Sequence, residues 1–216
     1  AASADDLFAS QQWTEALSEY QKEADPSVGT LQRMGQCALQ AGQMPEAVLY
    51  WRRAQKSLSF GSYLLLSRLT AGVQQQAGVA RAQHPAYAIL SDGLCAVPLL
   101  WWQLLFLLLW ALLLWRGRRL YSTGRWGWLG TILVIMVLIG VVTAHCSTQR
   151  SRTQAVILSS APLYSGPSTR YTQLSTLIPA SEVTVLGMRK AGTDPFYKVQ
   201  QGRTRGWVNG TQLGIV

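Results

Sequence analysis

The chain has 216 residues, of which 49% are apolar and only 13% are charged. That is about half the charged share of an ordinary soluble domain. The net charge of +9 is unevenly spread: residues 1–92 carry a net −1, residues 93–146 a net +4 and residues 147–216 a net +6. Because the basic excess is confined to the apolar segments and the tail, we do not expect nucleic acid to be the partner.

The first 57 residues carry apolar side chains at helical spacing in two similar units. Residues 13–20 align with residues 44–51, and Gln11 stands where the turn before the first unit would require a glycine. The pattern resembles the tetratricopeptide repeat, whose period is about 34 residues. We predict tetratricopeptide-like helical repeats over residues 1–57, and a generic helical hairpin is the alternative.

The second unit combines small residues, which let antiparallel helices approach closely, with large residues that fill the space between helix pairs. The small residues are Gly35, Ala38, Ala47 and Ala54, and the large ones are Leu31, Met34 and Trp51. The helix face that lines a groove in such repeats would carry a polar, uncharged set: Gln32, Gln36, Leu39 and Gln40. We take these four as candidate partner-binding residues, with a solvated helix face as the open alternative.

Residues 58–92 are interpreted as a capping helix and a linker. Leucine-rich sequence follows Leu58, and Tyr63, Leu66, Leu69 and Val73 fall on roughly one helical face. A terminal repeat must cover the exposed core of its neighbour. We therefore expect a third long helix here.

Two uncharged apolar segments follow, residues 93–115 and 126–146. Each has the roughly 20 residues that a membrane-spanning helix needs. The intervening residues 116–125 contain no acid and four arginines, which are Arg116, Arg118, Arg119 and Arg125. A short basic loop of this kind favours a cytoplasmic position, with both flanking regions outside.

The same segments contain small residues that permit close helix packing, Gly127, Gly130 and Gly140. Cys95 and Cys146 flank the segments and are interpreted as unpaired thiols, with a disulfide left open. The opening sequence AASADD is typical of a mature N-terminus left by signal-peptide cleavage. The expected location is the bacterial inner membrane, with the N- and C-terminal domains in the periplasm.

Residues 147–153 are a polar tether, and residues 154–216 change to the period of β-strands. Four short motifs occur in order, SGPS, V-x-V, FYKV and GWV. Together they resemble the bacterial SH3 domain and predict a small barrel with Trp207 in its core. Tyr164 and Tyr171 are candidate ligand-binding residues, and ordinary packing at the rim is the alternative.

The sequence offers little that could carry catalysis. Its two histidines are His84 and His145, and the tail has only Glu182 and Asp194 as acids. A metal site needs three or four ligands, and no phosphate-binding glycine loop follows a strand. We expect no enzyme activity, no metal and no cofactor.

The order of repeats, apolar hairpin and SH3-like tail is similar to the BatE proteins of bacterial Bat aerotolerance operons. The resemblance is carried by residues 45–47 (PEA), by the RGRR sequence between tryptophan-bearing segments, and by residues 155–158 (AVIL) leading into residues 161–168 (APLYSGPS). It implies a non-enzymatic adaptor that assembles with von Willebrand A-domain membrane proteins and a MoxR-type AAA+ ATPase in stress tolerance. The alternative is a membrane anchor that binds peptidoglycan through the SH3-like domain.

The expected fold class is therefore a multidomain membrane protein. It would combine all-α tetratricopeptide-like repeats, a two-helix transmembrane hairpin in the lipid bilayer, and an all-β SH3-like barrel.

Overall fold

The computed structural model describes residues 3–56, 58, 60–79, 99–122, 126–151, 153–191 and 194–216. The chain divides into two compact units. The first, the N/C unit, joins Ala1–His84 with Arg152–Val216, and the second, the hairpin unit, is Pro85–Ser151.

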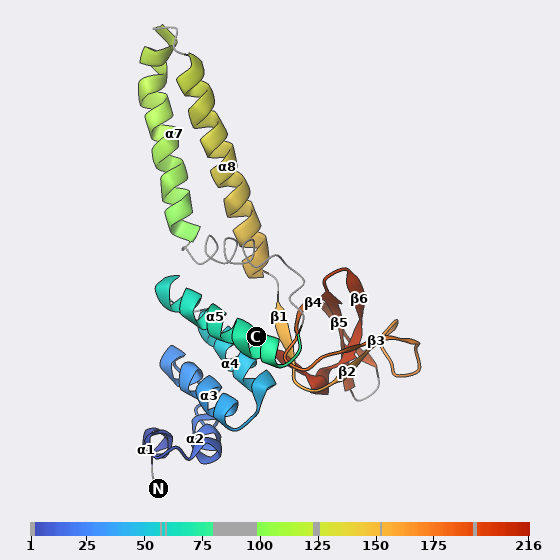
Figure 1. Cartoon of the computed structure of the whole chain (residues 1–216). Helices are drawn as coiled ribbons and strands as arrows, with labels where there is room; N and C mark the ends of the chain where they lie inside the picture. The colour runs from blue at the N-terminus through green and yellow to red at the C-terminus, as the bar shows by residue number, and fades with distance from the viewer. Residues whose placement is uncertain are drawn as a thin grey trace. The chain divides into compact units, whose positions relative to one another are not determined.

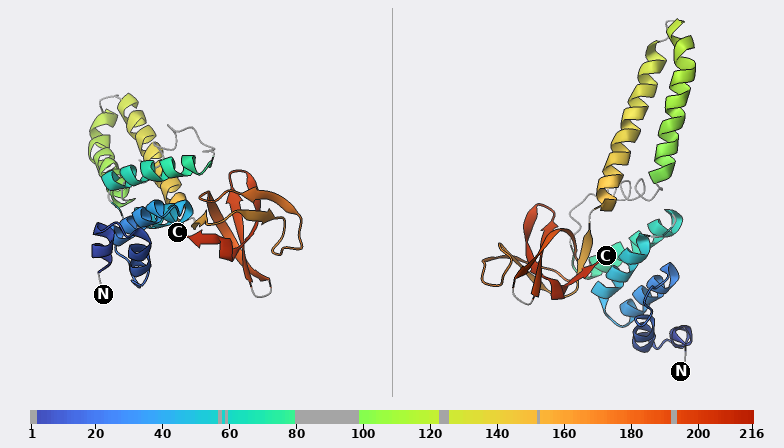
Figure 2. Two further views of the ribbon diagram at one scale, coloured as in Figure 1. Left: turned by 60° about the horizontal axis from the view of Figure 1, so that its bottom comes forward. Right: turned by 180° about the vertical axis from the view of Figure 1, so that it is seen from behind.

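The N-terminal part of the N/C unit is a series of helices, which we call the helical array. In the described residues they are α1 (Ala4–Ala9), α2 (Trp13–Tyr20), α3 (Val28–Gln40), α4 (Met44–Gln55) and α5 (Phe60–Gln76). Each helix contacts the next one in chain order, and Figures 1 and 2 show them stacked in that order. In the helical array, each helix therefore packs against its neighbour in the chain.

Helices α2 and α4 begin with the same backbone turn. Gln12 and Gln43 are their N-caps, with φ/ψ of −83°/71° and −86°/70°. The residue before each cap has a positive φ, 61° at Gln11 and 79° at Gly42. Glycine adopts this conformation without steric cost, and Gln11 adopts it without being glycine. The two units seen in the sequence are thus equivalent in backbone geometry.

The helical array packs around small residues, as predicted. Ala38, Ala47 and Ala54 are completely buried. A Cβ atom at Gly35 would lie 2.2 Å from Nε1 of Trp51, so the Trp51 indole lies directly on the glycine. The prediction that small residues permit close helix packing here is confirmed.

The C-terminal part of the N/C unit, residues 153–216, forms an antiparallel sheet that we call the sheet region. Its strands are β1 (Gln154–Ile157), β2 (Ala161–Tyr164), β3 (Gln173–Leu177), β4 (Glu182–Ala191), β5 (Asp194–Gln201), β6 (Thr204–Asn209) and β7 (Leu213–Ile215), with a 3₁₀ turn, η1 (Gly210–Gln212), before β7. The strand order is β3-β2-β6-β5-β4-β1-β7. Its core includes Ile157, Leu163, Val199 and Val208.

The predicted barrel requires a correction. An SH3-like β region is present, but the sheet is not a closed barrel, because β3 and β7 are the two edges of the strand order and do not pair. Strand β7 pairs with β1 on one side and contacts helix α4. The edge that closure would need is occupied by the helical array.

The hairpin unit contains α7 (Leu99–Ser122) and α8 (Trp126–Ser151), which lie side by side in Figures 1 and 2. Helix α7 continues through residues 116–122, so Arg116, Arg118 and Arg119 lie within the helix rather than in the predicted loop. Arginine and leucine are both good helix formers, which explains the extension. Arg125 lies outside the described residues.

The predicted membrane fold class is also corrected. Among the described residues, no helix is long and apolar enough to cross a membrane. The fold class of a multidomain membrane protein with a transmembrane hairpin is therefore wrong for the described structure.

The structure describes only some of the residues that were predicted to pack closely or considered for a disulfide in this unit. A Cβ atom at Gly140 would meet no atom within 4 Å, so Gly140 makes no close helix contact among the described residues. Gly127 and Gly130 lie in the first turns of α8, where side-chain surroundings are not described. Cys95 and the side chain of Cys146 also lie outside the described residues.

Candidate functional site

The helical array and the sheet region share one apolar core. Val48 and Leu49 of α4 and Val73 of α5 belong to the same buried cluster as Val156 of β1 and Ala180. The contact is tight, because a Cβ atom at position 214 in β7 would lie 2.7 Å from Cδ2 of Leu49. The two parts of the N/C unit therefore bury apolar surface against each other.

A partly buried ion pair joins the same two parts. Arg52 of α4 donates from Nε to Oε1 of Glu182 in β4 at 2.8 Å, and its Nη2 lies 2.7 Å from the same oxygen. Gln74 of α5 donates to that oxygen at 2.6 Å and to the Ala180 carbonyl at 3.2 Å. Glu182, one of two acids in the sheet region, is thus neutralised by the helical array.

Basic side chains of α4 also cap the β7 edge. Arg53 donates from Nε and Nη2 to the Ile215 carbonyl at 3.1 and 2.8 Å. Lys56 donates from Nζ to the Val216 carbonyl oxygen at 2.8 Å. An exposed sheet edge is a template for unwanted pairing, and here these contacts cover it.

The opposite part of the sheet carries a row of side chains across three strands. Trp207 of β6 lies opposite Tyr164 of β2 on one side and opposite Lys198 of β5 on the other. The neighbours of Trp207 in the strand, Gly206 and Val208, are buried, whereas Trp207 itself is half-buried. The predicted core position of Trp207 is therefore wrong, since alternation along β6 places it on the outer face.

Two further polar residues extend this row. Gln200 lies opposite Arg205 across β5 and β6, two residues along from Lys198 and Trp207 and therefore on the same face. The Arg205 Nε donates to Oε1 of Gln200 at 3.1 Å, which orients its guanidinium. We call Tyr164, Lys198, Gln200, Arg205 and Trp207 the outer-face row.

The sheet region is rich in exposed cations: Arg170, Arg189, Lys190, Lys198, Arg203 and Arg205. Among the described residues, none of these six has a carboxylate within ion-pair distance. The second acid, Asp194, accepts a long hydrogen bond from Asn209 at 3.4 Å. The outer-face row therefore lies in a region of uncompensated positive charge.

The two tyrosines predicted as ligand-binding residues have different surroundings. Tyr164 is half-buried and belongs to the outer-face row. Tyr171 is 52% exposed, and its ring lies against Gly166, where a Cβ atom would come within 2.6 Å of the ring carbons. Tyr171 therefore covers the loop after β2.

The predicted groove residues of α3 differ in exposure. Gln36 and Gln40 are exposed, and Gln32 and Leu39 are half-buried. Leu39 packs against the cores on both sides of the helix. The backbone carbonyl of Gln32 accepts a hydrogen bond from Trp51 at 3.4 Å.

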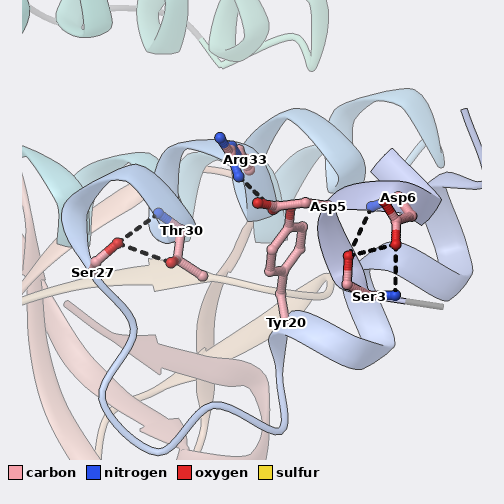
Figure 3. Close-up of polar contacts among 7 residues, drawn as sticks. All are labelled: Ser3, Asp5, Asp6, Tyr20, Ser27, Thr30 and Arg33. Atoms are coloured by element: carbon pink, nitrogen blue, oxygen red, sulfur yellow. Dashed lines mark hydrogen bonds and ion pairs between the residues drawn. The ribbon is translucent and has the colours of Figure 1, made fainter. Parts of the chain in front are cut away.

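Figure 3 shows a polar cluster at the N-terminal end of the helical array. Asp5 of α1 accepts hydrogen bonds from the Tyr20 hydroxyl and from Arg33, so it joins α1, α2 and α3. The hydrogen bond from Tyr20, and then that from Arg33, lower the pKa of Asp5 below its ordinary value of 3.8. Burial, followed by the bond to Asp5, raises the pKa of Tyr20 above 10.0.

Figure 3 also shows the caps of α1 and α3. The Ser3 hydroxyl accepts from the Asp6 backbone N–H, and the Asp6 carboxylate accepts in return from the Ser3 backbone N–H. This is a capping box. Ser27 accepts from the Thr30 backbone N–H in the same way. These contacts fix the ends of the helices, so the polar residues of Figure 3 have a structural role.

The described residues contain no group of His, Cys, Asp and Glu side chains that could hold a metal ion. Cys37 is free and buried, and burial raises the pKa of its thiol. A buried thiol of raised pKa is a poor nucleophile.

Residues 159–213 match the model of the bacterial SH3 domain family, and the predicted bacterial SH3 domain is confirmed over that range. No curated protein and no solved structure matches the chain. The comparisons do not support the resemblance to BatE, the tetratricopeptide identity of the repeats or the Bat partners.

The sequence interpretation missed Lys198, Gln200 and Arg205. Period-two alternation could have found them, because each is adjacent to a buried residue, Val199 or Gly206. It also missed the pairing of Arg52 with Glu182. Nothing local in the sequence indicates a contact between residues 130 positions apart.

Proposed function

We propose that the chain is a non-enzymatic binding protein whose bacterial SH3 domain holds an extended peptide segment on the outer-face row. The observation that carries this proposal is the asymmetry of the sheet region. The helical array covers β1, β7 and Glu182 of β4, whereas Tyr164, Trp207 and Lys198 stay uncovered by it. In this arrangement the helical array is a fixed platform that orients the peptide-binding face.

An adaptor for a protein partner is the function that we favour, because the binding face is part of a larger unit rather than a free module. Half-buried aromatic side chains give contact area at a low cost in side-chain entropy. A peptidoglycan stem peptide is a second candidate, since the bacterial SH3 domain family is associated with binding of proteins or of peptidoglycan.

The test is a selection of peptide ligands from a displayed random library against the full chain, with cell-wall sedimentation as a parallel arm. Both are repeated with Trp207→Ala and with the control Trp101→Ala, which changes an exposed tryptophan of the hairpin unit. We expect peptide ligands that Trp207→Ala weakens and Trp101→Ala does not. Wall binding with the same dependence would favour the second candidate, and absence of any Trp207-dependent ligand would overturn the proposal.

A further inference from the structure

The charge and spacing of the outer-face row indicate what kind of peptide it accepts, an inference that rests on the proposed function. We propose that the ligand is an acidic, extended protein segment with two carboxylates at alternate positions. One carboxylate is held by Lys198 and the other by Arg205, and the peptide backbone between them passes over Trp207.

The electrostatic part of the argument begins with the two acids of the sheet region. Glu182 is occupied by Arg52 and Gln74 at the interface with the helical array. Asp194 lies opposite Ala191 at the start of β5, four residues before Lys198. Neither carboxylate is an ion-pair partner of Lys198 or Arg205. The two cations are therefore available to a negatively charged ligand.

The second part is geometric. Lys198 lies opposite Trp207 and Arg205 is two residues before Trp207, so Lys198 and Arg205 are diagonal neighbours on one face of an antiparallel pair. Such neighbours are about 7–8 Å apart. In an extended peptide, side chains at positions i and i+2 point to the same side and are separated by about 6.6–6.8 Å. An acidic residue at every second position therefore matches the spacing of the two cations.

The third part is the orientation of Arg205. Its Nε is engaged by Gln200, and this bond leaves the two Nη groups to donate to a ligand. A guanidinium binds carboxylates through parallel hydrogen bonds, which gives geometric selectivity as well as charge. Gln200 is thus a positioning residue that acts through Arg205.

The same observations disfavour a nucleic acid or an anionic membrane surface. Those ligands need many cations arranged along a groove or a broad face. Here Lys198 and Arg205 are diagonal neighbours beside one half-buried tryptophan, Trp207, which favours a short extended segment whose two charges lie close together.

The experiment measures binding of labelled synthetic peptides to the full chain by fluorescence anisotropy. The probe is a nine-residue peptide with Glu-Pro-Glu at its centre, and the matched control peptide has Gln-Pro-Gln. We expect the acidic peptide to bind about tenfold to 25-fold more tightly at low salt, since two ion pairs contribute about threefold to fivefold each. The difference should shrink when the ionic strength rises to 1 M, where charges are screened within about 3 Å.

Variants test the assigned residues. Lys198→Gln and Arg205→Gln should each reduce the preference for the acidic peptide by about threefold to fivefold, without weakening the control peptide. Arg68→Gln, which removes an exposed cation of α5, should leave the preference unchanged. Lys198→Arg retains the charge and should retain the preference, which separates loss of charge from loss of folding.

The outcomes separate this inference from the proposed function. Equal binding of the acidic and neutral peptides, with both lost in Trp207→Ala, would overturn the acidic ligand and retain the peptide-binding function. Tighter binding of duplex DNA or of anionic phosphatidylglycerol vesicles through Lys198 and Arg205 would also overturn it. Absence of any Trp207-dependent peptide binding would overturn both.

Discussion

The helical array and the sheet region use their charged side chains in opposite ways. In the helical array Arg33 pairs with Asp5 and Lys22 with Glu19, and three further cations contact the sheet region: Arg52, Arg53 and Lys56. In the sheet region six exposed cations have no carboxylate partner among the described residues. Five cations of the first part therefore contact a partner within the N/C unit, whereas the six exposed cations of the second have no carboxylate partner among the described residues.

Glu182 is the exception to this contrast. It is an acid of the sheet region, yet its partners Arg52 and Gln74 come from the helical array. One of the two negative charges of the sheet region is therefore paired with a cation of the helical array.

The largest expected effect comes from breaking this contact. Glu182→Gln should destabilise the N/C unit by about 2–3 kcal/mol, because it leaves Arg52 without its counter-charge. The side chains are 12% and 29% exposed, so we expect less than the roughly 3–5 kcal/mol lost from a fully buried pair. Urea unfolding of the full chain, followed by tryptophan fluorescence, measures the change.

The control for this variant is Glu15→Gln, an exposed acid of α2, which should change stability by less than about 0.5 kcal/mol. Replacing both partners, in the double variant Arg52→Met with Glu182→Leu, should recover much of the lost stability. If Glu182→Gln unfolds at the same urea concentration as the unchanged chain, the contact does not hold the two parts together.

A second comparison lies within α3. Gly35→Ala should destabilise the helical array by about 2 kcal/mol, because the new methyl group would overlap the Trp51 indole. Gly29→Ala in the same helix should stabilise it by about 0.5–1 kcal/mol, since its Cβ would meet only the Ser27 hydroxyl oxygen at 3.8 Å. Thermal unfolding followed by circular dichroism distinguishes them, and a similar effect for both variants would contradict the tight contact.

The local elements were largely predictable from the sequence, and their boundaries less so. Spacing of Ala38, Ala47 and Trp51 predicted buried helix faces, and four strand motifs predicted the bacterial SH3 domain, because both patterns depend on near neighbours in the chain. The end of α7 was misplaced, since arginine was taken as a loop residue although it favours helices.

The long-range features could not have been predicted from these patterns. Contact of Arg52 with Glu182 and of Leu49 with residue 214 depends on how two distant segments pack. Local periodicity also cannot say which face of a two-sided strand is buried, which is why Trp207 was placed in the core. The groove of α3 was inferred from the repeat pattern alone, and its role in partner binding stays a prediction.

A smaller effect tests the equivalence of the two helix entries in the helical array. Gln11 has a φ of 61°, which costs a non-glycine residue about 1 kcal/mol or more. Gln11→Gly should therefore stabilise the array by about 0.5 kcal/mol, since part of the gain is offset by the larger entropy of glycine in the unfolded chain. The reverse change at the equivalent turn, Gly42→Gln, should be destabilising, and loss of stability in Gln11→Gly would show that the side chain itself is needed.

The smallest expected effect concerns the cluster of Asp5, Tyr20 and Arg33, in which Asp5 and Arg33 are exposed and Tyr20 is buried. The pKa of Asp5 is lower in the folded chain than its ordinary value of 3.8, so its contribution to stability is present above that value and is lost as the pH falls through the lower, folded pKa. The pKa of Tyr20 is raised above 10.0, so its contribution is present below pH 10 and is lost as the pH rises through the higher, folded value.

Asp5→Asn should lower the unfolding midpoint slightly between pH 5 and pH 8, and the difference should disappear well below pH 3.8. Asp6→Asn changes an acid of the same helix that caps Ser3 instead of contacting Arg33, and comparison of the two separates the cluster from the cap. A difference that stays constant down to the lowest pH would mean that Asp5 acts through its shape and not its charge, and would remove this pair from the charges that hold the helical array together.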